Sequence, residues 1–391
     1  MEVTNPKGIK KATIVVGIPS YNESRTIANV VEQVSKGLRE YYSDVDSVIV
    51  NVDNNSPDKT KEAFLSAKSE VPLIYVTTPE GTKGKGLNFY NLFSLFQELN
   101  AEKGLVVDAD LTNIEPKWVK KMIEPLDSGY EYVSPLYFRK KDDAYLTNQI
   151  IYPLFYGLLG VNIRQPIGGE FSFSSKMVDV WLNQEWTEYI KEFGIDSFMS
   201  AHAVLSGAKI CQVNLGRKMH KSSLPNLGPM FVQVINTLFR ILNEHPDEIK
   251  KINEVKEIKT FDDGDVDCKI ENSNPDYKAF EEIFNGEYCV VGNKLKKYLS
   301  EEIYKEVQDM KEGSETKIDT DLWIKIIYDF LSNFDKNDKE MVEALRCLYF
   351  GRITYFFKQI IELTPEETDQ KVLRQANKFF DQRDYYLKKF S

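Results

Sequence analysis

The sequence has few of the residues that most often build metal and redox centres. It contains three histidines, and its four cysteines, Cys211, Cys268, Cys289 and Cys347, lie far apart without a C-x-x-C pair. That spacing excludes a zinc finger and a dithiol redox motif, so we expect the cysteines to be reduced and structural. With only three histidines, each can be weighed singly as a metal ligand.

Long apolar runs and an excess of positive charge are also missing. The longest apolar stretch, residues 152–161, is too short to span a bilayer, and residues 1–11 contain no apolar segment of the signal-peptide kind. We therefore expect a cytoplasmic protein without a transmembrane segment. The net charge of -10 argues against a nucleic-acid partner, because broad binding to a phosphate backbone needs a basic surface.

Two signatures of nucleotide enzymes are absent. No G-x-x-x-x-G-K-[ST] loop occurs, and no G-x-G-x-x-G follows the first expected strand, which argues against an ATPase and a dinucleotide enzyme. The acidic run 263–267 is not a calcium loop, because Cys268 and Asn274 stand where such a loop needs Gly and Glu.

The sequence does contain an α/β pattern in its first half. Short β-branched runs alternate with amphipathic helical segments, which predicts βαβ units around a mostly parallel sheet flanked by helices. We expect strands at 13–19, 47–53, 73–77, 104–108 and 130–137, and helices at 26–42, 59–68, 87–99 and 116–126. The later segments 321–334, 340–363 and 365–390 have apolar faces that pack together. We predict a catalytic domain at 1–224 and a mainly helical region at 225–391.

Asp108 and Asp110 form the acidic triplet of greatest interest. The sequence has five Asp-x-Asp triplets, at 44/46, 108/110, 263/265, 265/267 and 319/321, so the letters alone prove nothing. Only 108/110 follows an uninterrupted apolar strand, and ligands of open α/β sheets collect at the carboxyl ends of strands. Residues two apart on an extended strand point to the same side, so both carboxylates could hold Mn²⁺ or Mg²⁺.

Other polar groups follow neighbouring elements. Asp53 and Asn54 end the second strand and could read a base edge or ribose hydroxyls, although both are also ordinary turn residues. The Gly84-Lys85-Gly86 motif opens a helix, where glycines allow a close approach to phosphate and the lysine adds a charge. His220 lies in a polar loop, and its position alone favours a surface histidine over a metal ligand.

The order of these motifs resembles a known family. The motifs are Pro19-Ser20-Tyr21-Asn22-Glu23, Val52-Asp53-Asn54-Asn55-Ser56, Gly84-Lys85-Gly86, Asp108-Ala109-Asp110, Gln165-Pro166-Ile167-Gly168-Gly169-Glu170, Gly194-Ile195-Asp196 and His220. Over residues 13 to 222 the chain resembles retaining glycosyltransferases of GT-A fold, of the mannosylglycerate synthase and glucosyl-3-phosphoglycerate synthase kind. Strand 47–53 departs from the usual acidic-glycine ending, which leaves the base preference open.

The resemblance implies a role for each motif. Asp110 and His220 would bind a divalent metal ion, Mn²⁺ or Mg²⁺, with Asp108 shared between the ion and the ribose. Glu170 and Asp196 would flank the transferred sugar, and together with Lys85 they would form the catalytic set. The residues expected to bind the nucleotide sugar are Pro19, Tyr21, Glu23, Asp53, Asn54, Gly84, Lys85, Asp108 and Ile167.

The segment 137–147 resembles the acceptor-binding stretch of mannosylglycerate synthase, in which an arginine and a threonine hold the acid. One residue is deleted here, so Arg139 or Lys140 would take the arginine's place and Thr147 that of the threonine. The expected reaction is the metal-dependent transfer of a hexose from a nucleotide-diphosphate sugar to glycerate or 3-phosphoglycerate, with retention. The product would be a compatible solute of the glucosylglycerate or mannosylglycerate type, and we expect a homodimer.

Two alternatives stay open at this point. One is an inverting family-2 glycosyltransferase acting on a glycan or lipid-linked acceptor, in which Glu170 or Asp196 would be the general base. The other is a non-catalytic assembly protein on a decayed transferase core, with the aromatic helices after Pro225 as its partner surface. The presence of Asp108, Asp110, Lys85 and His220 together argues against decay.

Overall fold

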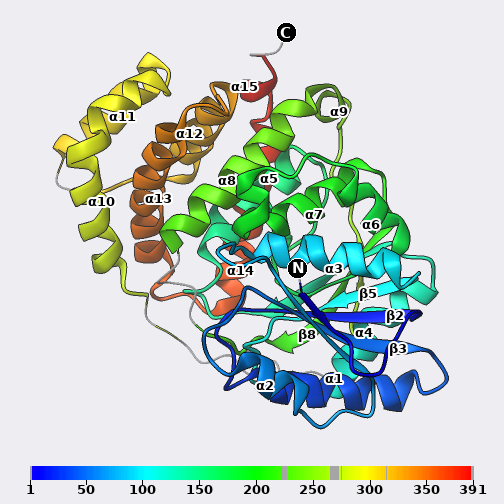
Figure 1. Cartoon of the computed structure of the whole chain (residues 1–391). Coiled ribbons are helices and arrows are strands. Elements are labelled where there is room, and N and C mark those ends of the chain that lie inside the picture. The colour runs from blue at the N-terminus through cyan, green and yellow to red at the C-terminus, as the bar shows by residue number, and fades with distance from the viewer. Residues whose placement is uncertain (1, 222–226, 265–272, 274, 314, 389–391) are drawn as a thin grey trace. The chain divides into compact units, whose positions relative to one another are not determined.

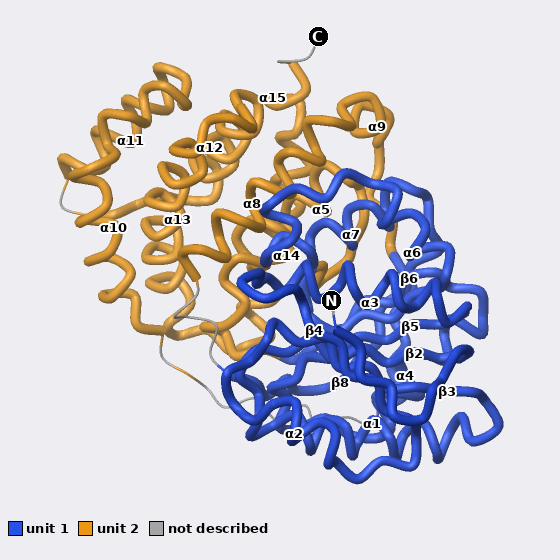
Figure 2. Tube along the Cα trace, viewed as in Figure 1, with its two compact units in different colours: residues 1–138, 167–225, 258–268 blue, residues 139–166, 226–257, 269–391 orange. Residues whose placement is uncertain are grey.

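The computed structural model describes residues 2–221, 227–264, 273, 275–313 and 315–388. The chain forms two compact units, one of residues 1–138, 167–225 and 258–268 and one of residues 139–166, 226–257 and 269–391 (Figure 2). The boundary expected at 224/225 and the triplet 265/267 lie outside the described residues. The second unit also takes in residues 139–166, which the expected division assigned to the first.

The first unit is built on a nine-stranded sheet with the order β1-β4-β3-β2-β5-β7-β6-β8-β9. β1 pairs antiparallel with β4, β7 pairs antiparallel with both of its neighbours, and every other pairing is parallel. The strands are β1 (Glu2–Thr4), β2 (Ile14–Ser20), β3 (Ser47–Asp53), β4 (Leu73–Thr77), β5 (Lys103–Val106), β6 (Tyr132–Phe138), β7 (Phe171–Ser174), β8 (Ile210–Arg217) and β9 (Lys259–Phe261). This confirms the expected α/β class.

Helices cover both faces of this sheet (Figure 1). On one face α1 (Ile27–Tyr41), α2 (Thr60–Leu65) and α4 (Pro116–Asp127) share an apolar core with the strands. On the other lie α3 (Lys85–Glu98), α6 (Ser175–Leu182) and α7 (Ile195–Leu205), where the ring of Phe93 stacks on Trp181 at 5.0 Å. Because both faces are covered, β2 is buried along its whole length, which explains its unbroken apolar sequence.

Some expected boundaries differ from the structure. β5 ends at Val106, so Asp108 and Asp110 lie beyond the strand, with Asp110 in a turn, and the argument from strand alternation does not apply to them. Helix α3 begins at Lys85 rather than Leu87, with Gly84 as its N-terminal flanking residue. The segment expected at 365–390 is two helices, α14 (Pro365–Asp381) and α15 (Asp384–Leu387).

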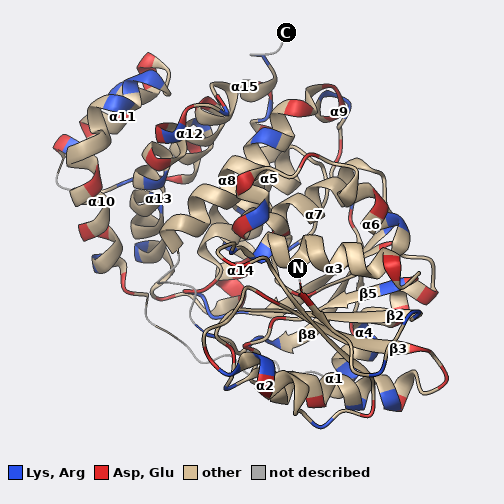
Figure 3. Cartoon of the chain, in the orientation of Figure 1, with Lys and Arg blue, Asp and Glu red and all other residues tan. Residues whose placement is uncertain are grey.

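The second unit is helical in its described residues. Its elements are the π-helix η1 (Thr147–Ile151), α5 (Tyr152–Gly157), α8 (Leu227–Glu244), α9 (Pro246–Lys250), α10 (Tyr277–Val291), the short 3-10 helix η4 (Gly292–Lys297), α11 (Glu301–Glu312), α12 (Thr320–Ser332), α13 (Lys339–Ile360), α14 (Pro365–Asp381) and α15 (Asp384–Leu387). Both acidic and basic residues occur along α10, α11 and α12, and the acidic ones are in excess on each helix (Figure 3).

None of the helices in the described part of the chain combines the length and the apolar composition needed to cross a membrane.

Candidate active site

The candidate catalytic residues gather at one edge of the sheet of the first unit. Strands β2, β3 and β5 run parallel to one another, and β6 and β8 run in the same direction on the other side of the antiparallel β7. Polar residues follow the carboxyl ends of these strands. β7 runs in the opposite direction, with Phe171 opposite Val106, so Glu170 just before it reaches the same edge as Asp108 just after β5. This is the edge at which open α/β sheets bind ligands.

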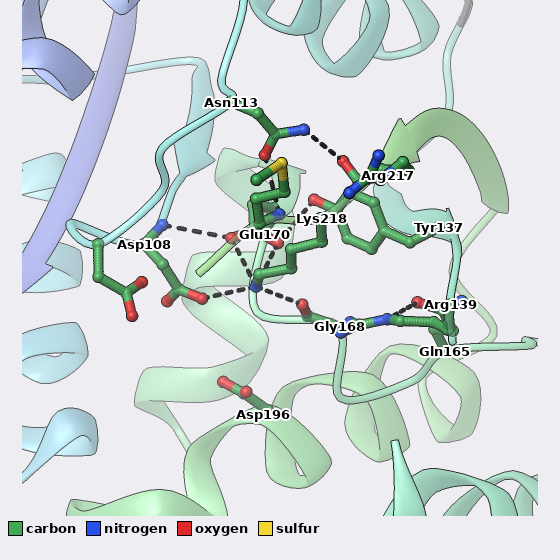
Figure 4. Close-up of polar contacts among 12 residues, drawn as sticks. Asp108, Asn113, Tyr137, Arg139, Gln165, Gly168, Glu170, Asp196, Arg217 and Lys218 are labelled. Atoms are coloured by element: carbon green, nitrogen blue, oxygen red, sulfur yellow. Dashed lines mark hydrogen bonds and ion pairs between the residues drawn. The ribbon is translucent and has the colours of Figure 1, made fainter. Parts of the chain in front are cut away.

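Lys218, which follows β8, joins the carboxylates of this edge (Figure 4). Its Nζ lies 2.7 Å from Asp108 Oδ2, 2.8 and 2.9 Å from the two oxygens of Glu170, and 2.9 Å from the carbonyl oxygen of Gly168. The side chains of Lys218 and Glu170 are 4% and 1% exposed. Tyr137 donates its hydroxyl to Glu170 Oε2 at 2.7 Å. Glu170 is therefore buried but held on both oxygens.

Lys85 links the same cluster to Asp196. Its Nζ lies 3.5 Å from Asp108 Oδ1 and 3.2 Å from Asp196 Oδ2. Three carboxylates and two ammonium groups thus form one network, each contributed by a different helix or loop. Asp196 Oδ1 is buried and has no hydrogen-bond partner among the described residues. Buried carboxylate oxygens are normally satisfied, so this atom is suited to accept a hydrogen bond from a ligand hydroxyl.

Burial and charge act in opposite directions on these groups. Burial raises the pKa of Asp108, but Lys218 and Lys85 outweigh it and hold the pKa well below its usual range. Burial lowers the pKa of Lys85, yet Asp108 and Asp196 bring it above its ordinary value. For Glu170 burial dominates over the charge of Lys218, and with Asp108 nearby its pKa rises to about 7. Burial also raises the pKa of Asp196 against the charge of Lys85.

Glycines make room for this network. Gly169 has φ +98°, and a Cβ there would lie 2.5 Å from Asp108 Oδ2 and 2.6 Å from Lys218 Nζ. At Gly84 and Gly86 a Cβ would lie 2.2 and 1.8 Å from main-chain carbonyl oxygens of residues 191 and 190. Close packing of α3 against the segment 190–194 therefore explains these two glycines. The sequence pattern had suggested that these glycines allow a close approach to phosphate. A Gly-Lys-Gly pattern alone does not distinguish such an approach from close packing against another segment.

Hydrogen bonds hold the loop after Asp110 against the loop that carries His220. Thr112 N donates to Met219 O at 3.0 Å and Met219 N donates to Asn113 Oδ1 at 2.9 Å. Asn113 Nδ2 donates to Arg217 O at 2.8 Å, and Lys221 N donates to Asp110 Oδ2 at 3.1 Å. His220 lies between Met219 and Lys221, so the chain brings it beside Asp110.

The carboxylate of Asp110 suits Mn²⁺ or Mg²⁺, and Mg²⁺ in particular takes part of its coordination from substrate phosphates. Among the described residues no three His, Cys, Asp or Glu side chains form a group that could hold a metal ion. A metal bound by Asp110 and His220 would thus depend on other ligands to complete its shell.

Asp53 and Asn54, the residues expected to bind the nucleoside, both form hydrogen bonds within the protein, but with different segments. Asp53 is fully buried, and its oxygens accept hydrogen bonds from Ser20 Oγ, Tyr75 Oη and both the N and Oγ of Ser56. It shapes the turn after β3, and its role toward a base stays a prediction. Asn54 Oδ1 accepts from Gly84 N at 3.2 Å, which fixes this turn to the start of α3.

The remaining donor-site predictions fall in β2, on the loop after it and on the segment before β7. Pro19 is buried within β2, whereas Tyr21 is exposed and accepts a hydrogen bond from Lys83 Nζ at 2.7 Å. Glu23 Oε2 lies 2.5 Å from Lys221 Nζ, and Ile167 is half-buried. These four residues keep their predicted role without a test.

The predicted acceptor residues belong to the second unit. Arg139 lies 3.1 Å from Asp143 and donates from Nε to Gln165 Oε1 at 3.3 Å. Lys140 is exposed, and Thr147 is buried at the first position of η1. The neighbouring Lys141 is buried and donates to the carbonyl oxygens of Ile361 and Leu363 just beyond α13, so its charge serves the fold.

Sequence reasoning missed Lys218, Tyr137 and Gly169 as parts of the site. Lys218 directly follows the apolar strand β8 and stands two residues before His220. This strand-end position, which singled out Asp108, could also have indicated Lys218 as a site residue. Tyr137 gave none, because an aromatic residue in a strand usually packs in the core. Gly169 could be recognised only from the side chains that it faces.

Comparison with known proteins gives the class of this site. Residues 15–182 match the family described as glycosyl transferase family 2. Over these residues the chain is similar to glycosyltransferase family 2, and the chain is a glycosyltransferase with a GT-A-like α/β fold.

The similar curated proteins carry more particular names. Glucosyl-3-phosphoglycerate synthase of Mycolicibacterium smegmatis is 29% identical over 248 residues, which cover 58% of this chain and 76% of that protein. Mannosylglycerate synthase of Rhodothermus marinus is 28% identical over 170 residues, which cover 41% of this chain and 42% of that protein. The chain is thus homologous to both kinds of synthase.

Among solved structures, glucosyl-3-phosphoglycerate synthase from Mycobacterium tuberculosis in complex with Mn²⁺, uridine diphosphate and glucosyl-3-phosphoglycerate is similar. It is 25% identical with a TM-score of 0.49, and the match covers 59% of this chain and 80% of that chain. The same enzyme in complex with Mg²⁺ and uridine diphosphate has the same score and identity.

Proposed function

We propose that this protein transfers a hexose from a nucleotide-diphosphate sugar to a small acidic acceptor such as glycerate or 3-phosphoglycerate, with retention of configuration. The network of Asp108, Glu170, Asp196, Lys85 and Lys218 is the observation that carries the proposal. It combines cations for a diphosphate with carboxylates for sugar hydroxyls at the ligand-binding edge of the sheet. The homologous synthases, by their names, use acceptors of this class.

Asp110 and His220 would hold the divalent ion, Mn²⁺ or Mg²⁺, with Asp108 close by. When bound, such an ion supplies a Lewis acid that neutralises charge on phosphate oxygens. Lys85 adds a fixed positive charge in the same region, with a raised pKa that keeps it protonated at any physiological pH. Charge that develops on the departing nucleoside diphosphate is the main electrostatic demand of the transfer.

In the transfer itself, the acceptor hydroxyl oxygen forms a bond to the anomeric carbon while the bond from that carbon to the diphosphate oxygen breaks. Attack on the face of the leaving group gives retention, and the departing phosphate takes the proton of the hydroxyl. No side chain needs to become covalently attached. The unpartnered Oδ1 of Asp196 would hold a sugar hydroxyl during this step.

Glu170 would orient the site rather than act as a general base. Both of its oxygens already accept hydrogen bonds from Lys218, and one also accepts from Tyr137. An inverting enzyme would need one such carboxylate to receive the acceptor proton. The anomeric configuration of the product, read by NMR, separates the two mechanisms.

The acceptor would be recognised by the segment 139–147, in which Arg139 or Lys140 would bind the carboxylate. The proposed contact of Thr147 with the acceptor rests on the resemblance alone, because Thr147 is buried in η1.

The test is a donor screen with UDP-, GDP- and ADP-sugars against glycerate and 3-phosphoglycerate, in the presence of Mn²⁺ or Mg²⁺. We expect one pair to give a glycosylated acid, and Asp110→Ala to abolish its formation while the fold stays intact by circular dichroism. Asp44→Ala, which removes an acid of another Asp-x-Asp triplet on an exposed loop, is the matched control. Full turnover by the Asp110 variant would overturn the metal assignment, and the absence of transfer in every pair would overturn the proposed function.

A further inference from the structure

Arg352, in the middle of α13, is a buried cation that forms no ion pair with a carboxylate of the described residues. It is 1% exposed, and its guanidinium donates to four oxygens within the second unit. These are Gln149 Oε1 at 2.9 Å, Ile318 O at 2.9 Å, Thr320 Oγ1 at 3.3 Å and Gln375 Oε1 at 2.5 Å. Burial lowers its pKa to about 10. An arginine is a costly way to fill a core position, so a requirement other than packing would explain it.

The groups around Arg352 converge on η1, the π-helix that begins at Thr147. The carbonyl oxygen of Asn148 accepts from Gln375 Nε2, and that of Gln149 accepts from Trp323 Nε1, both at 2.8 Å. In a π-helix the main-chain ladder is widened, so carbonyl groups can accept from side chains instead. Arg352 is bonded to Gln149 of η1, to Gln375 of α14 and to Thr320 at the start of α12, and it therefore joins η1 to both helices that support it.

The backbone just before η1 is also unusual. Ala144 has φ +54°, in the left-handed region that residues with a side chain rarely adopt. Such a conformation persists only where the surroundings hold it, and both it and π-helices are frequent near functional sites. The segment 144–151 therefore has a shape that its own sequence does not favour, and α12, α13 and α14 supply the bonds that stabilise it.

We propose that Arg352 is a positioning residue for the acceptor, which sets the conformation of the acceptor segment 139–147 by holding η1 through Gln149 and Gln375. This inference rests on the proposed function, since the segment's acceptor role is part of it. Arg352 acts through other residues, because its guanidinium bonds to Gln149 and Gln375, which lie outside the segment 139–147. Helices α12, α13 and α14 thereby gain a role in acceptor affinity.

The experiment compares Arg352→Met with Arg346→Met. Arg346 lies on the same helix and pairs with Glu287 and Glu343, and it has no bond to η1. We expect Arg352→Met to raise the acceptor KM by about ten-fold or more, because small misplacements of a binding element cost one to two orders of magnitude, with the donor KM changed less than about two-fold. Arg346→Met should leave both values near wild type.

Gln375→Leu is the second variant, and it tests the positioning role of Arg352 if Arg352→Met does not fold. It removes one link while leaving Arg352 in place, and we expect the same selective rise in acceptor KM to a smaller extent. Equal changes in both KM values, or equal effects of the Arg352 and Arg346 variants, would overturn the inference while transfer by the wild-type protein still upheld the proposed function. No transfer by the wild-type protein would refute both.

Discussion

Gly169 offers the sharpest test of the charged network, because a single methyl group would be placed between its members. A Cβ at this position would lie 2.5 Å from Asp108 Oδ2, whereas ordinary contacts begin at 3.4 Å. In Gly169→Ala the carboxylate of Asp108 must therefore move by about 0.9 Å, or the loop must move instead. Either shift disturbs the 2.7 Å ion pair between Asp108 and Lys218.

Two costs can be separated. The positive φ of Gly169 alone costs an alanine about 1–2 kcal/mol, since this backbone region crowds a Cβ. The displacement adds to that, and a shift of about 1 Å in a reacting constellation lowers turnover by about 100-fold. We therefore expect Gly169→Ala to lower kcat/KM by about two orders of magnitude, and to lower the free energy of unfolding by more than 2 kcal/mol as a rough figure.

Gly207→Ala is the matched control. Gly207 has φ +70°, and a Cβ there would meet nothing within 4 Å. It should lose about 1–2 kcal/mol of stability through the same backbone effect and keep its full kcat/KM. The assays are urea unfolding and initial rates with the donor and acceptor pair that the wild-type protein uses. If the two variants had equal kcat/KM, the idea that the Asp108–Lys218 contact is needed for transfer would be refuted.

Two further predictions concern other parts of the site. Burial raises the pKa of Glu170 from 4.5 to about 7. The protonated carboxyl group therefore makes its full contribution to the stability of the folded state below pH 4.5, and that contribution is lost as the pH rises to 7. In metal-free protein, Glu170→Gln should therefore gain up to about 3 kcal/mol relative to wild type between pH 4.5 and 7, and a flat difference in urea titrations would contradict the assigned pKa. Arg139→Ala or Lys140→Ala should raise the acceptor KM far more than the donor KM, since a cation holds the acid. Steady-state kinetics measure this split, and equal effects on both substrates would exclude these side chains from acceptor binding.

Much of the fold could be predicted because the sheet is buried on both faces. Strands such as Ser47–Asp53 and Leu73–Thr77 are mainly apolar and β-branched runs between turn residues, and the structure has them with the expected bounds. The end of β5 was less clear, since Val107 continues the apolar run after the last paired residue. Apolar character therefore located the strands better than it located their ends.

The candidate site was predictable where chemistry and position coincide. Asp108, Glu170 and Asp196 do come together with Lys85, although the resemblance rather than the pattern singled out Glu170 and Asp196. The part played by Lys218 depends on side-chain direction across the sheet edge, which spacing along the chain does not encode. Asp53 illustrates the reverse case, because a carboxylate at a strand end can serve the turn that follows it.

The division of the chain into units has a consequence for how the protein can be cut. The chain passes between the units at residues 138/139, 166/167, 225/226, 257/258 and 268/269, so neither unit is one continuous piece of sequence. A fragment that stopped at residue 224 would lack β9, leave the edge of β8 unpaired, and expose the apolar segment 150–159 without the helices that cover it. Neither unit is therefore complete in a fragment that ends at residue 224. Such a fragment should aggregate rather than act as an enzyme by itself.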